Sequence, residues 1–281
     1  MIVDSHTHVA SLDTDRYPTS PTGVGSNWWS EGPNGADELL SAMAVAGVDR
    51  AVVVQAVGVY GYDCRYAIDA VTAHPEQLAL VGAINMEGDD PPRDLAILAA
   101  NAPLGGVRLF GVGGTSPGWL ADGRADEVWA AAAELGCSII PTLFAADLPG
   151  LRSPIEAHPR VPVIVDHCGF PDLTGGAPYD SATTLFDMAD LGSVSLKVSS
   201  HILLDARAAG DPADLIDRLA ETFGADRLCW GSDYPQTQAL SYAEMVDLGR
   251  HAARRLAPLD QDAFLGGTSA ALWWNEMEDS Q

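Results

Sequence analysis

The chain has 281 residues and a formal net charge of −24, from 15 basic and 39 acidic residues. This length suits one large domain, and the acidic balance argues against nucleic acid and anionic membranes as partners, because both are bound by basic surfaces. The chain opens with no basic and apolar leader, and no window offers the run of about 20 apolar residues that a membrane helix needs, so we expect a soluble, cytoplasmic protein.

The first eight residues carry the most informative local pattern. Ile2 and Val3 begin a short apolar run that predicts a buried strand, and residues two apart on a strand point to the same face. His6 and His8 therefore project side by side from the end of this strand, where two imidazoles are able to bind one divalent metal ion. Two histidines alone are weak evidence for a metal site, so the interpretation needs partners further along the chain.

The segment that follows this strand breaks the regular pattern. Residues 9–34 form a long loop that is rich in Gly, Pro and Ser and contains Trp28 and Trp29. In a barrel, this loop lies over the C-terminal face, where active sites are built. A loop of this length usually has a function, and the two tryptophans favour order. We expect either a lid over a site or a contact between subunits.

Short apolar strands then alternate with Ala- and Leu-rich helical stretches. We expect strands near 2–7, 50–56, 78–84, 104–110, 138–144, 161–167, 194–199 and 227–232. We expect helices near 35–47, 62–74, 90–101, 125–136, 147–158, 180–191, 212–223 and 241–256. Eight such units predict an α/β protein, a single-domain (β/α)8 TIM barrel over residues 1–281. An open doubly wound sheet is the alternative, and it is weakened by the count of eight and by the lack of a G-x-G-x-x-G after the first strand.

Two of the expected helices begin with explicit capping signals. Ser241 and Glu244 have the spacing of a capping box, in which each side chain bonds the backbone N–H of the other residue. Asp211 precedes Pro212, which places an N-cap residue before a first-turn proline. We therefore expect helices to start at these two positions.

Polar residues recur where the expected strands end, and in a barrel these ends converge on one pocket. In chain order they are His6, His8, Gln55, Arg108, Asp166, His167, Lys197, Ser199, His201 and Asp233. Among them, three imidazoles and one carboxylate form a set that suits Zn²⁺ or a related divalent ion: His6, His8, His167 and Asp233. The other three histidines, His74, His158 and His251, lie within or at the ends of expected helices, and we interpret them as surface or capping residues.

Three segments resemble the motifs of the amidohydrolase-related (amidohydrolase 2) family, a TIM-barrel branch of the amidohydrolase superfamily. They are Val3–His8 (VDSHTH), Val165–Gly169 (VDHCG) and Trp230–Pro235 (WGSDYP), at the start, middle and end of the chain. The segments Gly106–Arg108 and Ser195–Ser199 add a likeness to the lactonase group, which includes 2-pyrone-4,6-dicarboxylate lactonase and L-fuconolactonase. The resemblance implies a first-strand ligand pair at His6 and His8, the mid-chain histidine at His167 and the last-strand aspartate at Asp233.

The sequence departs from one common pattern of that superfamily. Many members carry a carboxylated lysine that bridges two metal ions, but no lysine occupies a matching strand end here, and Arg108 ends the fourth strand. We therefore expect one divalent metal ion, zinc in preference to manganese. Weak or absent occupancy is left open, because some lactonases of this branch work without a tightly held metal.

These observations together predict a hydrolase that opens a small carboxylated lactone, or a related acyl C–O or C–N bond, with metal-activated or Asp-activated water. Asp233 is the expected proton acceptor, His167 a second catalytic residue, and Arg108 the partner of a substrate carboxylate. Further substrate contacts are expected from Lys197, His201 and Gln55. Structural ion pairs are the alternatives for Arg108 and for Lys197, the latter with Asp4 or Asp166.

Two other classes of function stay open on the sequence. A metal-dependent decarboxylase of an aromatic or unsaturated acid would use the same ligand set. A non-enzymatic binding protein built on a barrel is disfavoured, because a site without catalytic function has no physical reason to keep these four residues together. In every case the expected partner is a small anionic molecule, and a homo-oligomer is left open.

Overall fold

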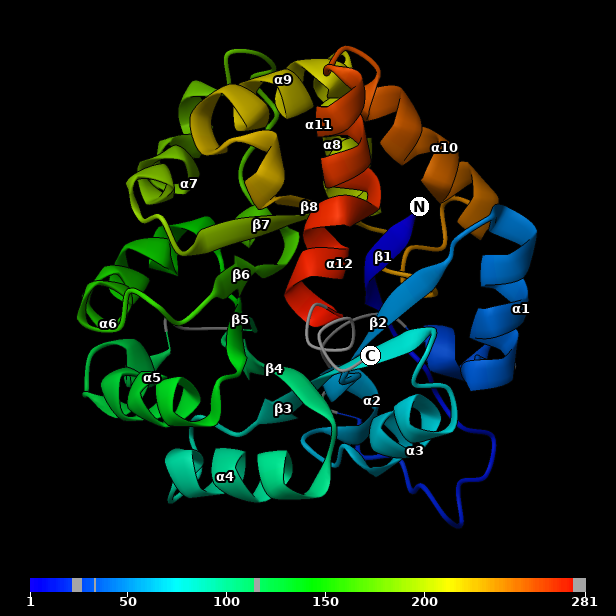
Figure 1. The fold of residues 1–281 in the computed structure, drawn as a ribbon, viewed down its shortest axis with the longest axis vertical. Helices are drawn as coiled ribbons and strands as arrows, with labels where there is room; N and C mark the ends of the chain where they lie inside the picture. Colours follow the sequence, from blue (N-terminus) through cyan, green and yellow to red (C-terminus); the bar gives the residue numbers. More distant parts are fainter. Residues whose placement is uncertain (22–26, 33, 114–116, 275–281) are drawn as a thin grey trace, which may run out of the picture.

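The computed structural model describes residues 1–21, 27–32, 34–113 and 117–274, so part of the loop expected over 9–34 lies outside the described residues. Eight parallel strands hydrogen bond in chain order, and a parallel bridge between Thr7 and Tyr234 joins the first strand to the segment after the last. The strands are β1 (Val3–Thr7), β2 (Arg50–Val54), β3 (Leu78–Ile84), β4 (Leu104–Phe110), β5 (Ser138–Thr142), β6 (Val163–Val165), β7 (Val194–Ser199) and β8 (Leu228–Gly231). The expected (β/α)8 barrel is confirmed, and Figure 1 shows the helices arranged as a ring around it.

The helices of the ring follow the strands, with α2 and α8 as added elements on the C-terminal side. They are α1 (Ala36–Ala46), α2 (Val57–Tyr60), α3 (Arg65–Ala73), α4 (Pro91–Asn101), α5 (Arg124–Leu135), α6 (Arg152–Ala157), α7 (Thr183–Phe186), α8 (Ser200–Ala209), α9 (Pro212–Phe223), α10 (Tyr242–Ala253), α11 (Pro258–Asp262) and α12 (Thr268–Trp273). None of the helices in the described ranges is long and apolar enough to cross a membrane.

Two parts of the helix prediction need correction. The helix expected near 180–191 is one short turn, α7, between two 3₁₀ turns at Asp180–Ala182 and Asp187–Asp190. Aspartate and threonine crowd this stretch, and their side chains compete with the helix for backbone hydrogen bonds. Four further helices, α2, α8, α11 and α12, were not among the eight expected.

Both capping signals are confirmed. The Ser241 side chain accepts a hydrogen bond from the backbone N–H of Glu244, and the Glu244 carboxylate accepts one from Ser241 in return. Asp211 accepts from the backbone N–H of Ala213 at the start of α9. Helices α9 and α10 therefore begin where the sequence predicted.

One end of the barrel is plugged. Apolar side chains from several strands, among them Val3, Val52 and Ile140, pack in the interior against Trp274. The neighbouring Trp273 lies so close to Gly105, at the start of β4, that a Cβ there would come within 2.8 Å of its ring. Figure 1 shows α12, which carries this pair toward the chain end, crossing the centre of the ring. The N-terminal mouth is thus filled, and polar side chains are left to the opposite, C-terminal end.

Strand β1 contains a bulge. Asp4 pairs with Ala51 of β2, whereas Thr7 pairs with Val53, so three steps along β1 match two steps along β2. A bulge of one extra residue changes which face the following side chains occupy. After the bulge, residues with even numbers take the face that odd-numbered residues held before it.

This bulge directs the two histidines into the barrel. Val3 lies in the interior cluster, and without the extra residue His6 and His8 would point to the opposite face. Buried Asp4 fixes the geometry, because its Oδ1 accepts hydrogen bonds from the backbone N–H of His6 at 3.0 Å and of Ser232 at 2.9 Å. Asp4 thereby ties the bulge to the end of β8.

Candidate active site

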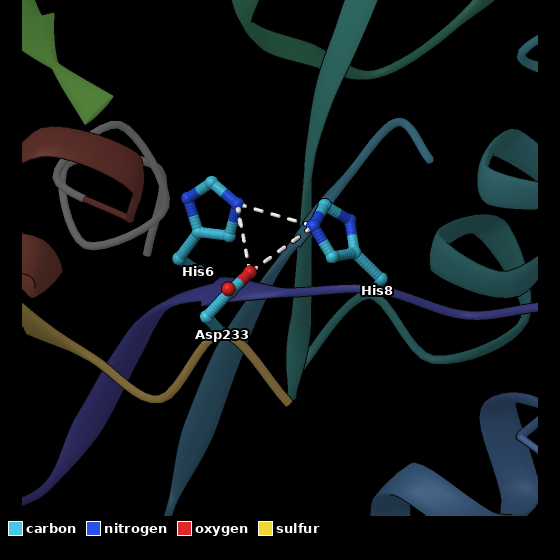
Figure 2. A group of neighbouring side chains, drawn as sticks. All are labelled: His6, His8 and Asp233. Carbon is cyan, nitrogen blue, oxygen red and sulfur yellow. Dashed lines mark hydrogen bonds and ion pairs between the residues drawn. The ribbon is translucent and has the colours of Figure 1, made fainter. Parts of the chain in front are cut away.

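Three ligating atoms meet at the C-terminal end of the barrel. The Nε2 atoms of His6 and His8 are 3.2 Å apart, and Oδ1 of Asp233 lies 3.7 Å from the first and 3.4 Å from the second. Figure 2 shows the two rings and the carboxylate pointing toward one another. Ligand atoms about 2.0–2.1 Å from one zinc ion in a tetrahedral site lie roughly 3.3–3.4 Å apart. The spacing therefore fits one divalent ion.

The hydrogen-bond partners of the two rings support this fit. His8 Nδ1 lies 2.8 Å from the carbonyl oxygen of Val54, which only accepts, so this nitrogen carries the proton. His6 Nδ1 faces the Asp166 carboxylate at 3.2 Å, and burial lowers the pKa of His6 to about 3. Both Nε2 atoms then present lone pairs to each other and to Asp233 Oδ1, which has no hydrogen-bond partner among the described residues. A cation is the group that three such acceptors would hold.

Asp166 is the centre of a buried ionic network beneath this triad. Its Oδ1 lies 3.2 Å from His6 Nδ1 and 3.2 Å from Lys197 Nζ, and its Oδ2 accepts from Arg108 Nε at 2.9 Å and Thr142 Oγ1 at 2.7 Å. Burial alone would raise the pKa of Asp166, but the surrounding positive charges, Lys197 first, hold it well below its ordinary range. An ionised Asp166 keeps the His6 ring oriented with its Nε2 toward the site.

Asp233 follows β8 in a left-handed backbone conformation, with φ of 60°. This conformation is uncommon for residues other than glycine, although aspartate tolerates it better than most. Its backbone N–H donates to His6 O at 2.9 Å, which fixes the carboxylate beside the histidines. Burial alone would raise the pKa of Asp233, but the neighbouring imidazoles, His201 first, hold it well below its ordinary range. The carboxylate is therefore ionised and able to accept a proton.

His167 is positioned by a second left-handed segment. Four consecutive residues, His167 to Phe170, have φ of 55°, 53°, 72° and 50°. Each non-glycine residue in this region is disfavoured by about 1–2 kcal/mol, and such backbone persists only where the surroundings over-determine it. The turn ends β6 earlier than expected and sends the His167 ring toward the site, where its Nδ1 lies 2.9 Å from Ser199 Oγ.

The four predicted ligands divide into overlapping groups. His6, His8 and Asp233 form one group whose ligating atoms all lie within 4.8 Å of one another. His167 belongs to two others, one with His201 and Asp233 and one with His6 and Asp166. His167 therefore lies beside the triad, not inside it.

A cavity of about 260 Å³ opens next to the triad. His8, Arg108 and His167 line it together with Trp28, whose ring lies 6.0 Å from the His8 ring at an interplanar angle of 18°. Trp28 therefore lies against the cavity. Both alternatives for the loop, a lid over the site and a contact between subunits, stay predictions.

The residues predicted to contact the substrate lie in different surroundings. Arg108 forms the structural ion pair with Asp166 through its Nε and also lines the cavity, and its contact with a substrate stays a prediction. Lys197 is fully buried and pairs with Asp166, which is the salt-bridge alternative. Gln55 donates from Nε2 to the carbonyl oxygens of Gly61 and Asp63, so it holds a loop. Neither Lys197 nor Gln55 lines the cavity.

His201 lies next to Asp233 and His167 and is not part of the described cavity lining. Its Nδ1 is 3.1 Å from Ser199 Oγ and 3.7 Å from Asp233 Oδ2. Its ring contacts those of His167 and Phe170, with centroids 4.7 Å and 5.5 Å away. This placement suits a residue that orients Asp233.

Sequence reasoning missed the roles of several residues. Asp166 was considered only as a possible ion-pair partner of Lys197, and its contacts with His6 and Arg108 were not foreseen, although its place beside His167 was a usable signal. Asp4 was considered only as a partner of Lys197, yet its carboxylate Oδ2 accepts from Tyr242 Oη at 2.8 Å and its Oδ1 holds the bulge. No pattern in the sequence pointed to Phe170.

A parallel eight-stranded barrel with histidines and an aspartate gathered at its C-terminal end defines a TIM-barrel enzyme. The family model described as amidohydrolase matches residues 3–273. The chain therefore belongs to the amidohydrolase family and is a hydrolase, which confirms the resemblance seen in the motifs.

Individual relatives agree with this assignment. An L-fucono-1,5-lactonase from Burkholderia ambifaria is 26% identical over 239 residues, covering 83% of this chain and 80% of the relative. A solved probable 2-pyrone-4,6-dicarboxylic acid hydrolase from Acinetobacter baumannii, with citric acid bound, has a TM-score of 0.78 at 18% identity, covering 96% and 98% of the two chains. A solved amidohydrolase from Burkholderia multivorans, with zinc bound, has a TM-score of 0.77 at 22% identity, covering 97% and 98%.

The fold is also shared with an enzyme of a different reaction. A 2,6-dihydroxybenzoate decarboxylase from Rhizobium has a TM-score of 0.68 at 14% identity, covering 96% of this chain and 98% of that one. At these levels of identity, the likeness to the solved structures shows the fold alone.

Proposed function

We propose that this hydrolase opens a small carboxylated lactone to the corresponding hydroxy acid. One observation carries the proposal: the His6–His8–Asp233 triad lies at the edge of a cavity that Arg108 also lines. The triad suits activation of water, and the guanidinium suits a substrate carboxylate. The lactonase named among the relatives supports lactone opening, and the citric acid bound in a structure of the same fold supports a carboxylated ligand.

We propose a single divalent ion, zinc in preference to manganese, held by His6, His8 and Asp233. Catalytic zinc sites typically use three protein ligands and keep a further position open. When bound, the ion supplies Lewis-acid chemistry, which acidifies water and polarises a carbonyl oxygen. The bound zinc of one solved amidohydrolase supports the choice of metal.

The residues of the chain supply the proton transfers. Asp233, ionised at neutral pH, accepts a proton from the attacking water as the water oxygen bonds the lactone carbonyl carbon. The ring C–O bond then breaks, and Asp233 returns the proton to the departing alkoxide oxygen. One water is consumed, and one hydroxy acid is formed.

His167 lines the cavity, and its ring lies 4.6 Å from the His6 ring of the triad. Its Nδ1 is bonded to Ser199 Oγ, and burial holds the pKa of His167 well below its ordinary value, so the ring is neutral. A neutral imidazole is able to donate one hydrogen bond to the carbonyl oxygen as its charge develops. This is the catalytic role that we propose for His167.

Arg108 holds the substrate carboxylate in this scheme. Its Nε is used by Asp166 and Thr142, which fixes the plane of the guanidinium at the cavity wall. A fixed guanidinium loses little freedom when it binds a carboxylate. Arg108→Met should therefore raise KM for carboxylated lactones far more than for neutral ones, and equal effects on both would mark Arg108 as purely structural.

The proposal is tested by metal analysis and a small lactone panel on the purified protein. Metal analysis should find about one zinc ion per chain. Lactone opening releases an acid, and a pH indicator should follow its formation. Chelation should lower the melting temperature and zinc should restore it, because a ligand that binds only the folded state stabilises it. The variant His8→Ala should lose this response.

Carbon dioxide release from an aromatic or unsaturated acid, with no lactone turnover, would overturn the proposal in favour of the decarboxylase alternative. The decarboxylase that shares the fold makes this the assay to run in parallel.

A further inference from the structure

The cavity beside the triad is walled mainly by apolar side chains. They include Trp28, Val57, Val59, Phe110, Phe144 and Phe170. They come from the loop that carries Trp28, from α2 and from the carboxyl ends of β4, β5 and β6. A volume of about 260 Å³ is at the small end for ligand sites, so a bound molecule contacts these walls closely.

Aromatic rings stand next to both histidines that line the cavity. The Trp28 ring is nearly parallel to that of His8, at 18°. The Phe170 ring lies 4.9 Å from the His167 ring, and the Phe144 ring lies 5.6 Å from Phe170. Flat, apolar surfaces therefore face the cavity from both sides of the site.

Few polar side chains are left to bind hydroxyl groups. The described polar side chains that line the cavity are His8, Arg108, Thr142, His167 and Gln236. The Thr142 hydroxyl already donates to Asp166 and accepts from Arg108. The two histidines belong to the reacting centre. Gln236 is the remaining neutral group in the described lining, whereas a sugar lactone brings several hydroxyls, each of which is costly to bury without a partner.

The backbone shows that the Phe170 ring is held in place. Phe170 has φ of 50°, a conformation that is an outlier for a bulky residue. Its N–H donates to His167 O at 2.9 Å, and a Cβ on the preceding Gly169 would come within 2.8 Å of Leu148. The disfavoured turn therefore fixes the Phe170 ring beside the His167 ring, and backbone strain of this kind clusters at functional sites.

We propose that the substrate is a lactone with few hydroxyl groups, a flat unsaturated or aryl body and at most one carboxylate, and that Phe170 determines this specificity. The inference rests on the proposed lactonase function. One carboxylate is the limit because Arg108 is the one cationic side chain in the described lining outside the reacting histidines. The apolar rings then take the body of the substrate, and polyhydroxylated sugar lactones are excluded.

The test compares two δ-lactones of the same ring size, one with a phenyl substituent and one with three hydroxyls. For each, kcat/KM is divided by the rate of spontaneous hydrolysis at the same pH, so that intrinsic reactivity cancels. We expect the phenyl lactone to be preferred by about tenfold or more, the discrimination that hydrophobic contacts give.

Two variants complete the test. Phe170→Asn removes the ring but tolerates the left-handed backbone, and it should lower the corrected value for the phenyl lactone by about tenfold and that for the hydroxylated one by less than about twofold. Phe186→Leu is the matched control, because Phe186 packs against Arg218 outside the cavity lining, and it should change neither.

The outcomes are distinguishable. A preference for the hydroxylated lactone, or an equal loss on both substrates in Phe170→Asn, would overturn the specificity inference and leave the lactonase proposal standing. Turnover of neither lactone, nor of any other in the panel, would overturn the proposed function and the inference together.

Discussion

Asp166 illustrates how one residue supports both the stability and the chemistry of this site. It is fully buried and shares its two oxygens among His6, Lys197, Arg108 and Thr142. Burying several charges is favourable only when each has a partner, so removal of the shared anion leaves cations without compensation. The same carboxylate orients the His6 ring toward the ligand triad.

Asp166→Asn should therefore lower the free energy of unfolding by about 3–5 kcal/mol, the cost of breaking a buried ion pair. Urea denaturation followed by circular dichroism measures this, with Asp190→Asn as the control. Asp190 is an exposed partner of Arg152, and exposed pairs contribute at most about 1 kcal/mol. If the free energy of unfolding fell by a similarly small amount in both variants, the buried charges of Lys197 and Arg108 would not depend on Asp166 for stabilisation.

Asp233→Asn should keep the fold and lose most turnover. The carboxamide cannot accept a proton, and general acid–base groups typically contribute 10²–10⁴-fold. Steady-state kinetics on an active lactone measures the loss, and Asp172→Asn is the control, because Asp172 is an exposed loop residue whose carboxylate accepts from Thr174. Near-wild-type turnover would assign the proton transfer to another residue.

At the level of elements, α9 and α10 are joined by charges at their ends. Asp211 caps α9 and pairs with Arg254 and Arg255, which follow α10. These guanidinium groups, Arg254 first, hold the pKa of Asp211 well below its ordinary value. A carboxyl whose pKa is depressed in the folded state stabilises the protein above its unfolded pKa, and the contribution is lost as the pH falls through the folded value.

Asp211→Asn tests this contribution without losing the cap, because asparagine caps helices about as well as aspartate. The wild type should melt at a higher temperature than the variant at pH 7. This difference in melting temperature should decrease as the pH falls below about 4, the unfolded pKa of aspartate. High salt should decrease the difference too, since these charges are partly exposed. A difference that is independent of pH would mean that the ion pairs contribute nothing.

The elements also show where prediction from sequence ends. Alternation along a strand placed His6 and His8 on one face, and strand-end reasoning brought Asp233 to them. The bulge that turns this face inward was not predictable, because Asp4 fixes it by bonding Ser232, 228 residues away along the chain. The left-handed run from His167 to Phe170 was equally hidden, since three of its four residue types disfavour that backbone.

At the scale of the whole molecule, burial of the thiols should protect them from reagents in solution. The four cysteines, Cys64, Cys137, Cys168 and Cys229, are all buried, and burial raises the pKa of three of the thiols, Cys64, Cys137 and Cys229, to about 11. The thiolate is the reactive form, so these residues should be inert in the folded protein.

Titration with Ellman's reagent at pH 8 should accordingly release far less than one equivalent per chain from the native protein within minutes. In guanidinium chloride it should release about four, one for each cysteine. A thiol that reacts rapidly in the native state would reveal local opening of the element that carries it.

The plug formed by Trp273 and Trp274 has a consequence for the order of events in turnover. With the N-terminal mouth filled, the cavity at the other end serves as both entrance and exit. A hydroxy acid must leave by the route along which the next lactone arrives, so product and substrate cannot occupy this route together. Product should therefore be a competitive inhibitor, which changes the slope of a double-reciprocal plot and leaves its intercept on the rate axis unchanged. Each product molecule must leave before the next substrate molecule enters.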